Sequence, residues 1–158
     1  MSETIFELDT MLDQSDMRGA ITEFPNQIKK SFSIMSTWKA RLEYRNIENI
    51  MVLGMGGSAI GGDVARVLAQ NANSAPIIIN RSYNIPEWVG SNTLILACSY
   101  SGGTEETLSA FAQCRERNCP IIVLSTGGII TDYADKYDLD RIPIPSGYQP
   151  RAALGFSF

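Results

Sequence analysis

One stretch decides the fold of this 158-residue chain: Ile50-Met-Val-Leu-Gly-Met-Gly-Gly-Ser-Ala-Ile-Gly-Gly-Asp63. Its first four residues form an unbroken apolar run, which is typical of a strand covered on both faces in a parallel sheet. Glycines and a serine follow, and Val64, Val67 and Leu68 then supply the apolar face of a helix. A strand, a glycine-rich turn and a helix in this order predict one unit of an α/β fold.

The same pattern continues along the rest of the chain. Further strands are expected at residues 77–79, 94–97, 121–124 and 141–144. Leu108, Phe111, Ala112 and Arg115 continue a second helix, and residues 129–137 predict a third, shorter one. We therefore expect an α/β domain of three layers, with a parallel sheet of about five strands flanked by helices.

Residues 1–45 are predicted to form a helical arm that precedes the domain at 46–158. Weak helical anchors within residues 1–22 are Ile5, Leu8, Met11 and Leu12. A long amphipathic helix is expected from Pro25 onward, and its expected core-packing residues are Ile28, Phe32, Met35 and Leu42, with Trp38 beside them. Residues 147–158 resemble a loop that enters a new helix and breaks off, so the chain is expected to be part of something longer.

Composition narrows the functional classes. The formal net charge of −4 argues against a nucleic-acid partner, which usually requires a basic surface. The chain has no histidine, and Cys98, Cys114 and Cys119 form no CxxC pair, so neither a metal site nor a disulfide framework is expected. The beginning of the chain lacks the features of a signal peptide, and no apolar stretch is long enough to span a membrane, so a cytoplasmic location is predicted.

The loop after the first strand is a candidate anion site. Glycines such as Gly56 and Gly57 let a backbone approach an anion, and free amides at a helix N-terminus point towards it. Ser58 can either cap the helix or donate to a ligand oxygen. Gly54, Gly56 and Ala59 also fit the dinucleotide fingerprint, but the next strand ends in Asn80-Arg81 rather than in an acidic residue that would hold a ribose. In that alternative, Arg81 would meet a ribose phosphate instead.

The loop after the strand at 94–97 carries a more specific pattern, Ser99-Tyr-Ser-Gly-Gly-Thr-Glu-Glu-Thr107. Its candidate phosphate ligands are the hydroxyls of Ser99, Ser101 and Thr104 and the amides of Gly102 and Gly103. A capped helix is the alternative, with Ser101 or Thr104 as N-cap, and both can be true. The acidic residues at 105 and 106 would repel a phosphate and are expected to face away from it.

Three segments together resemble the bifunctional phosphoglucose/phosphomannose isomerase family, and more generally the sugar isomerase (SIS) domain. They are residues 54–63, residues 99–107 and Gln149-Pro-Arg-Ala-Ala-Leu-Gly155. The resemblance implies an SIS-type fold and assigns sugar-phosphate binding to Gly56, Gly57, Ser58, Ser99, Ser101, Gly102, Gly103 and Thr104. It also implies that Arg151 is an active-site arginine that stabilises enediolate charge.

Two departures from the family pattern bear on activity. Gly103 stands where the family has an asparagine. The family's glutamate base, ring-opening histidine and lysine belong to a second SIS domain and a neighbouring subunit, and this chain has no such domain.

The resemblance therefore implies the N-terminal half of an enzyme that interconverts glucose 6-phosphate or mannose 6-phosphate with fructose 6-phosphate, without a cofactor. A second SIS domain and a homodimer are the expected partners, and the chain alone is expected to be nearly inactive. The alternatives are a non-catalytic SIS module that senses a phosphosugar and, less in keeping with the motifs, a nicotinamide-dependent enzyme.

Overall fold

The sheet is built from five parallel strands in the order β2-β1-β3-β4-β5. The computed structural model describes residues 12–72 and 75–157. The strands are β1 (Asn49–Leu53), β2 (Ile77–Asn80), β3 (Thr93–Ser99), β4 (Ile121–Ser125) and β5 (Asp140–Pro143). All five predicted strands are confirmed, with shifts of one or two residues at their ends. Apolar runs mark β1 to β4 because both faces of a parallel sheet are covered, whereas the edge strand β5 has the sequence Asp-Arg-Ile-Pro and a weaker pattern.

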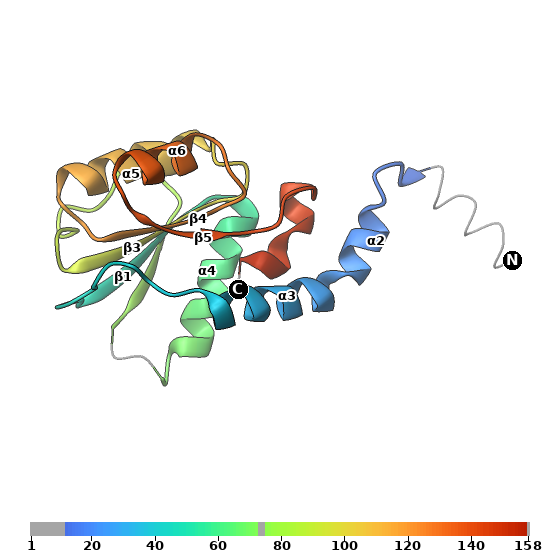
Figure 1. Cartoon of the computed structure of the whole chain (residues 1–158), viewed down its shortest axis with the longest axis horizontal. Helices are drawn as coiled ribbons and strands as arrows, with labels where there is room; N and C mark the ends of the chain where they lie inside the picture. Colours follow the sequence, from blue (N-terminus) through green and yellow to red (C-terminus); the bar gives the residue numbers. More distant parts are fainter. Residues whose placement is uncertain (1–11, 73–74, 158) are drawn as a thin grey trace, which may run out of the picture.

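Helices cover both faces of the sheet and complete the three layers (Figure 1). α5 (Glu105–Glu116) and α6 (Ile129–Lys136) lie on one face, and α4 (Gly56–Ala69) lies on the other. The core beneath α5 and α6 includes Met51, Leu53 and Phe111. Within the described ranges, no helix has both the length and the apolar character needed to cross a membrane.

The helix α4 packs through small residues instead of its larger apolar ones. Ala59, Gly61 and Gly62 are buried, whereas Val67 and Leu68 are exposed. A Cβ added at Gly62 would lie 3.0 Å from the Val52 side chain, so the helix backbone sits close to the sheet. The prediction was wrong for Val67 and Leu68, because close backbone approach decides which face is covered, whereas Val64 is half-buried.

The N-terminal helices are α2 (Met17–Thr22) and α3 (Phe24–Thr37). The expected core stripe is wrong at three of its four positions: Phe32 is 73% exposed, and Met35 and Leu42 are also exposed, whereas Ile28 is half-buried. The helix instead buries Gln27 and Ser31. It also ends earlier than expected, because Trp38 is extended and its indole Nε1 donates to the Arg141 carbonyl at 2.6 Å.

The predicted anchors Ile5, Leu8 and Met11 lie outside the described residues. Leu12 is described and is exposed.

A coil that follows α3 is fixed to β5 by one buried carboxylate. Asp140 is 1% exposed and accepts hydrogen bonds from the Arg41 amide, the Arg41 Nε, the Leu42 amide and the Tyr44 hydroxyl. Burial opposes ionisation of this carboxyl, yet the bonds from Leu42, Arg41 and Tyr44 together lower its pKa below the usual value. Burial, followed by the neighbouring Asp140, raises the pKa of Tyr44, so its hydroxyl remains a donor.

The C-terminal segment forms two short 3-10 turns, η1 (Pro150–Ala152) and η2 (Leu154–Phe156), where one new helix was expected. Figure 1 shows these turns beside α3 and α4. A Cβ added at Gly61 of α4 would lie 2.2 Å from the Ser157 carbonyl oxygen, and one added at Gly155 would lie 2.6 Å from Gln27 Cβ. The segment is therefore held closely between the two helices.

Candidate functional site

The two glycine-containing loops lie side by side at the carboxyl edge of the sheet. One follows β1 and the other follows β3, which are neighbouring strands. From β1 the chain crosses to β2 on one side, whereas β3, β4 and β5 extend on the other. A Cβ added at Gly54 would lie 3.2 Å from the carbonyl oxygen of Cys98 near the end of β3, so the first loop starts close to the end of the neighbouring strand. Ligands of open parallel sheets bind at such a switch in strand order.

The first loop leads into α4 through Gly56, whose φ of +51° favours glycine. Met55 occupies the N-cap position and makes no side-chain capping bond. Ser58 does not act as the cap, and within the described ranges its hydroxyl makes no hydrogen bond to the protein. The Ser58 amide already donates to the Met55 carbonyl at 3.1 Å. The amides of Gly56 and Gly57 and the Ser58 hydroxyl are therefore the groups of this turn that can reach an anion at the positive end of the helix dipole.

The second loop brings together the hydroxyls of Ser99 and Thr104, whose Oγ and Oγ1 atoms are 3.1 Å apart. The Gly102 amide donates to Ser99 Oγ at 3.1 Å, and the Gly103 amide lies 3.4 Å from Ser101 Oγ. Thr104 is the N-cap of α5 but makes no side-chain capping bond. The structure thus gives Thr104 the predicted N-cap position and leaves the amides of the first turn of α5 without a side-chain cap.

The acidic residues of α5 are near Tyr83 at the start of the helix. The charge of Glu106 is the main cause of the raised pKa of Tyr83, followed by burial and by Glu105. Both carboxylates therefore lie close to the Tyr83 hydroxyl. Both lie in the first turn of α5, at the positive end of its dipole.

A third loop, residues 126–128 after β4, was missed in the sequence. Thr126 Oγ1 donates to the Tyr100 carbonyl at 2.8 Å, and the Ile130 amide donates to the Gly102 carbonyl at 2.9 Å. Gly102 has a φ of +71°, and a Cβ there would lie 1.8 Å from the Gly127 carbonyl oxygen. The Ser-Thr-Gly-Gly run directly after a predicted strand was the signal that could have revealed this loop.

Arg151 lies in η1 and is exposed. A Cβ added at Gly57 would lie 3.4 Å from the Pro150 carbonyl oxygen, so η1 runs beside the first loop. Tyr100, within the second loop, donates its hydroxyl to the Pro145 carbonyl at 3.1 Å and accepts from the Tyr148 amide at 3.0 Å. The structure therefore gathers all three predicted segments at one edge of the sheet. Among the described residues, the Arg151 side chain makes no ion pair or hydrogen bond.

Two other groups near the loops are occupied or inert. Arg81, which the dinucleotide alternative would use, forms an ion pair with Asp63 of α4. Burial raises the pKa of Cys98 to about 12, so this thiol stays protonated and is a poor nucleophile at neutral pH. In the part of the chain that the structure describes, no cluster of acidic, cysteine or histidine side chains is arranged to hold a metal ion.

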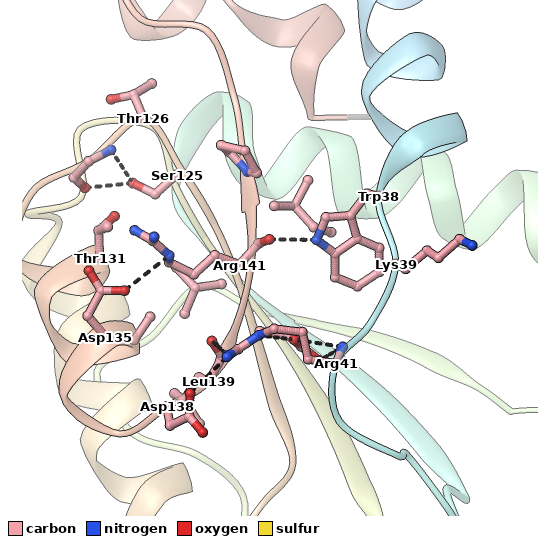
Figure 2. A pocket seen from close by; sticks show the side chains of 16 residues that line it. Trp38, Lys39, Arg41, Ser125, Thr126, Thr131, Asp135, Asp138, Leu139 and Arg141 are labelled. Carbon is pink, nitrogen blue, oxygen red and sulfur yellow. Dashed lines mark hydrogen bonds and ion pairs between the residues drawn. The ribbon is translucent and has the colours of Figure 1, made fainter.

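A cavity of about 590 Å³ lies elsewhere, between α6, β5 and the coil after α3 (Figure 2). Two of the cations that line it are already paired, Arg41 with Asp138 and Arg141 with Asp135. It is also lined by Ser125, Thr126 and Gly127 at the third loop, but none of the predicted site residues lines it. We therefore place the candidate site where the three predicted segments meet, at residues 54–63, 99–107 and 149–155, and not in this cavity.

Comparisons with known proteins agree with this arrangement. No protein-family model matches the chain. It is 43% identical over 142 residues to a bifunctional phosphoglucose/phosphomannose isomerase from Caldicellulosiruptor bescii, covering 90% of this chain and 42% of that protein. It is 39% identical over 140 residues to the enzyme of the same name from Thermoplasma acidophilum, covering 89% of this chain and 43% of that protein.

The fold also has solved counterparts. A provisionally assigned phosphosugar isomerase from Clostridium difficile 630 superimposes with a TM-score of 0.71 at 16% identity, covering 89% of this chain and 43% of that one. At this identity the likeness shows the fold alone, and the fold is of the SIS type. The chain spans somewhat less than half the length of the curated relatives it matches. On its sequence, the chain belongs to the bifunctional phosphoglucose/phosphomannose isomerase family.

Proposed function

We propose that this chain is the substrate-binding part of an isomerase that interconverts glucose 6-phosphate or mannose 6-phosphate with fructose 6-phosphate. The observation that carries the proposal is the meeting of three family segments at one edge of the sheet. In this proposal residues 46–158 form the SIS domain, residues 1–45 form its helical arm, and the protein works in the cytoplasm. The relatives that are similar to it in sequence are named after this isomerase activity.

In the proposed reaction, the amides and hydroxyls of the first two loops hold the phosphate. This accounts for Gly56, Gly57 and Ser58 in the first loop. In the second loop the proposed ligands are Ser99, Ser101, Gly102, Gly103 and Thr104. Arg151 supplies positive charge beside the enediolate that forms as a proton moves between C1 and C2. The base for that transfer comes from elsewhere, since neither loop offers one.

Two measurements test this function. The chain should bind fructose 6-phosphate in calorimetry and show almost no isomerase turnover by itself. In a complete two-domain protein, Arg151→Ala should abolish most turnover. A sensor would instead keep its ligand response after that substitution, and a nicotinamide enzyme would show a thermal shift with NADP rather than with fructose 6-phosphate.

Loop hydroxyls are expected to contribute strongly to affinity. Ser101→Ala and Thr104→Ala should each weaken fructose 6-phosphate binding by about 10- to 150-fold, since a hydrogen bond to a charged acceptor contributes about 1.5 to 3 kcal/mol. Calorimetry on the purified variants measures this. Ser109→Ala is the matched control, because Ser109 lies further along α5 and donates to the Tyr83 carbonyl. Unchanged affinity in both loop variants would mean that the second loop only begins α5 and does not bind the phosphate.

The proposed partner is a second SIS domain, with homodimerisation of the complete protein. Phe32 and Met35 are exposed apolar residues on α3, and exposed apolar residues of this kind support the proposal that a partner covers this surface. Replacing both with Ser should reduce self-association of the chain in sedimentation velocity at high concentration. Ile129→Ser provides the control, because Ile129 is an exposed apolar residue on the opposite layer. Equal association of both variants would place the interface elsewhere.

A further inference from the structure

The side chain of Gln27 on α3 is buried and forms hydrogen bonds with the segment that carries Arg151. Gln27 is 1% exposed. Its Nε2 donates to the Ala152 carbonyl at 2.7 Å, and its Oε1 accepts from the Gly155 amide at 3.0 Å. Both ends of one amide thus bind backbone groups about 125 residues away in the chain. The contact spans the junction of η1 and η2.

A buried amide is an unusual choice for this position if its task is only to cover the segment. An apolar side chain would do so without the desolvation cost that a polar group carries. Ser31, one turn further along α3, donates to the Gly155 carbonyl at 2.8 Å. The two side chains therefore fix the segment through three directional bonds, which define its orientation as well as its distance.

The segment needs this support because it has little structure of its own. η1 and η2 are single 3-10 turns of three residues each. Such turns have poorer hydrogen-bond geometry than an α-helix and are stable only in context. On the other side, Pro150 lies against Gly57 of the first loop. Arg151 is thus held between the phosphate loop and the Gln27 amide.

We propose that Gln27 is a positioning residue that sets the place of Arg151 relative to the sugar-phosphate loops. This inference rests on the proposed function, because it assigns Arg151 to the same ligand. Gln27 touches backbone atoms on the far side of the segment and acts on the ligand only through Arg151.

The test uses the purified chain and Gln27→Met, which keeps the length of the side chain and removes both hydrogen bonds. Fructose 6-phosphate affinity should fall about 3- to 10-fold, as expected for the loss of one or two neutral hydrogen bonds that fix a ligand group. When Arg151 is already replaced by Ala, Gln27→Met should lower fructose 6-phosphate affinity by less than about twofold. The reason is that two residues that act through one contact have coupled effects. Equal losses in both backgrounds would overturn the proposal.

A second readout does not depend on the ligand. Hydrogen exchange of residues 150–157 should accelerate in Gln27→Met in the free protein, because the segment loses its anchor. Unchanged exchange would also overturn the proposal. If the wild-type chain fails to bind fructose 6-phosphate, the proposed function falls, and the exchange result then decides whether Gln27 orders the Arg151 segment.

The matched control is Gln113→Met on α5. Gln113 also holds a distant loop through its amide, donating to the Tyr83 carbonyl at 2.6 Å and accepting from the Ile85 amide at 3.3 Å. It should lower thermal stability much as Gln27→Met does, while leaving ligand affinity and exchange at residues 150–157 unchanged. Loss of affinity in both variants would show a general effect of destabilisation and would count against a positioning role.

Discussion

Gly102→Ala is expected to destabilise the chain by about 2 to 5 kcal/mol. The left-handed backbone at this position costs a residue with a Cβ about 1 to 2 kcal/mol, and forcing atoms into a packed site typically costs about 1 to 3 kcal/mol more. Here the added Cβ would lie 1.8 Å from the Gly127 carbonyl oxygen, so backbone must move. Thermal unfolding should show a Tm lower by roughly 5 to 15 °C.

Two other glycines separate the causes of this effect. Gly56 has a φ of +51° but open space around it, so Gly56→Ala should show only the conformational cost of about 1 to 2 kcal/mol. Gly103 has open space and no left-handed backbone, so Gly103→Ala should change stability least. If Gly102→Ala were no worse than Gly56→Ala, the tight contact between the second and third loops would not exist in solution.

Asp140→Asn is expected to cost about 3 kcal/mol of unfolding free energy. Four donor groups converge on this carboxylate, and an amide has a single acceptor oxygen with which to replace two. Its NH₂ group would also face donors. Denaturant unfolding measures the loss. The control is Asp138→Asn, whose carboxylate pairs with Arg41 but is 81% exposed, so its removal should change stability by less than about 1 kcal/mol.

The difference in unfolding free energy between wild type and Asp140→Asn should depend on pH in a defined direction. The pKa of Asp140 is lower in the folded chain than in the unfolded one, so its contribution is fully present above the unfolded value of about 3.9. It is lost as the pH falls through the lower, folded pKa. The gap in stability between wild type and Asp140→Asn should therefore be widest near neutral pH and narrow below about pH 4. A gap that widens in acid would contradict the assignment.

The sequence predicted those parts of the molecule that depend on local pattern. Apolar runs located the first four strands, because strands of a parallel sheet are covered on both faces, whereas β5 at the edge of the sheet carries only a weak apolar pattern. The two loops were found because glycines and hydroxyls directly follow such strands, and the order of strands then placed them together.

The sequence did not predict features that depend on tertiary contact. Periodicity favoured Phe32 and Met35 for the core, whereas α3 turns Gln27 and Ser31 inward because their polar groups meet the backbone of the C-terminal segment. The third loop was missed for a similar reason. Its part in the site depends on Gly102 and Gly127 meeting across the space between two strands.

The coil after α3 also bears on how the edge of the sheet is protected. β5 is a terminal strand. The carbonyl of Leu139, directly before it, accepts from the Arg41 guanidinium, and the carbonyl of Arg141 within it accepts from the Trp38 indole. Side chains thus occupy acceptors that would otherwise be open to a strand of another molecule. Trimming the chain to residues 46–158 would uncover this edge, and the shortened protein would be prone to aggregate by strand addition.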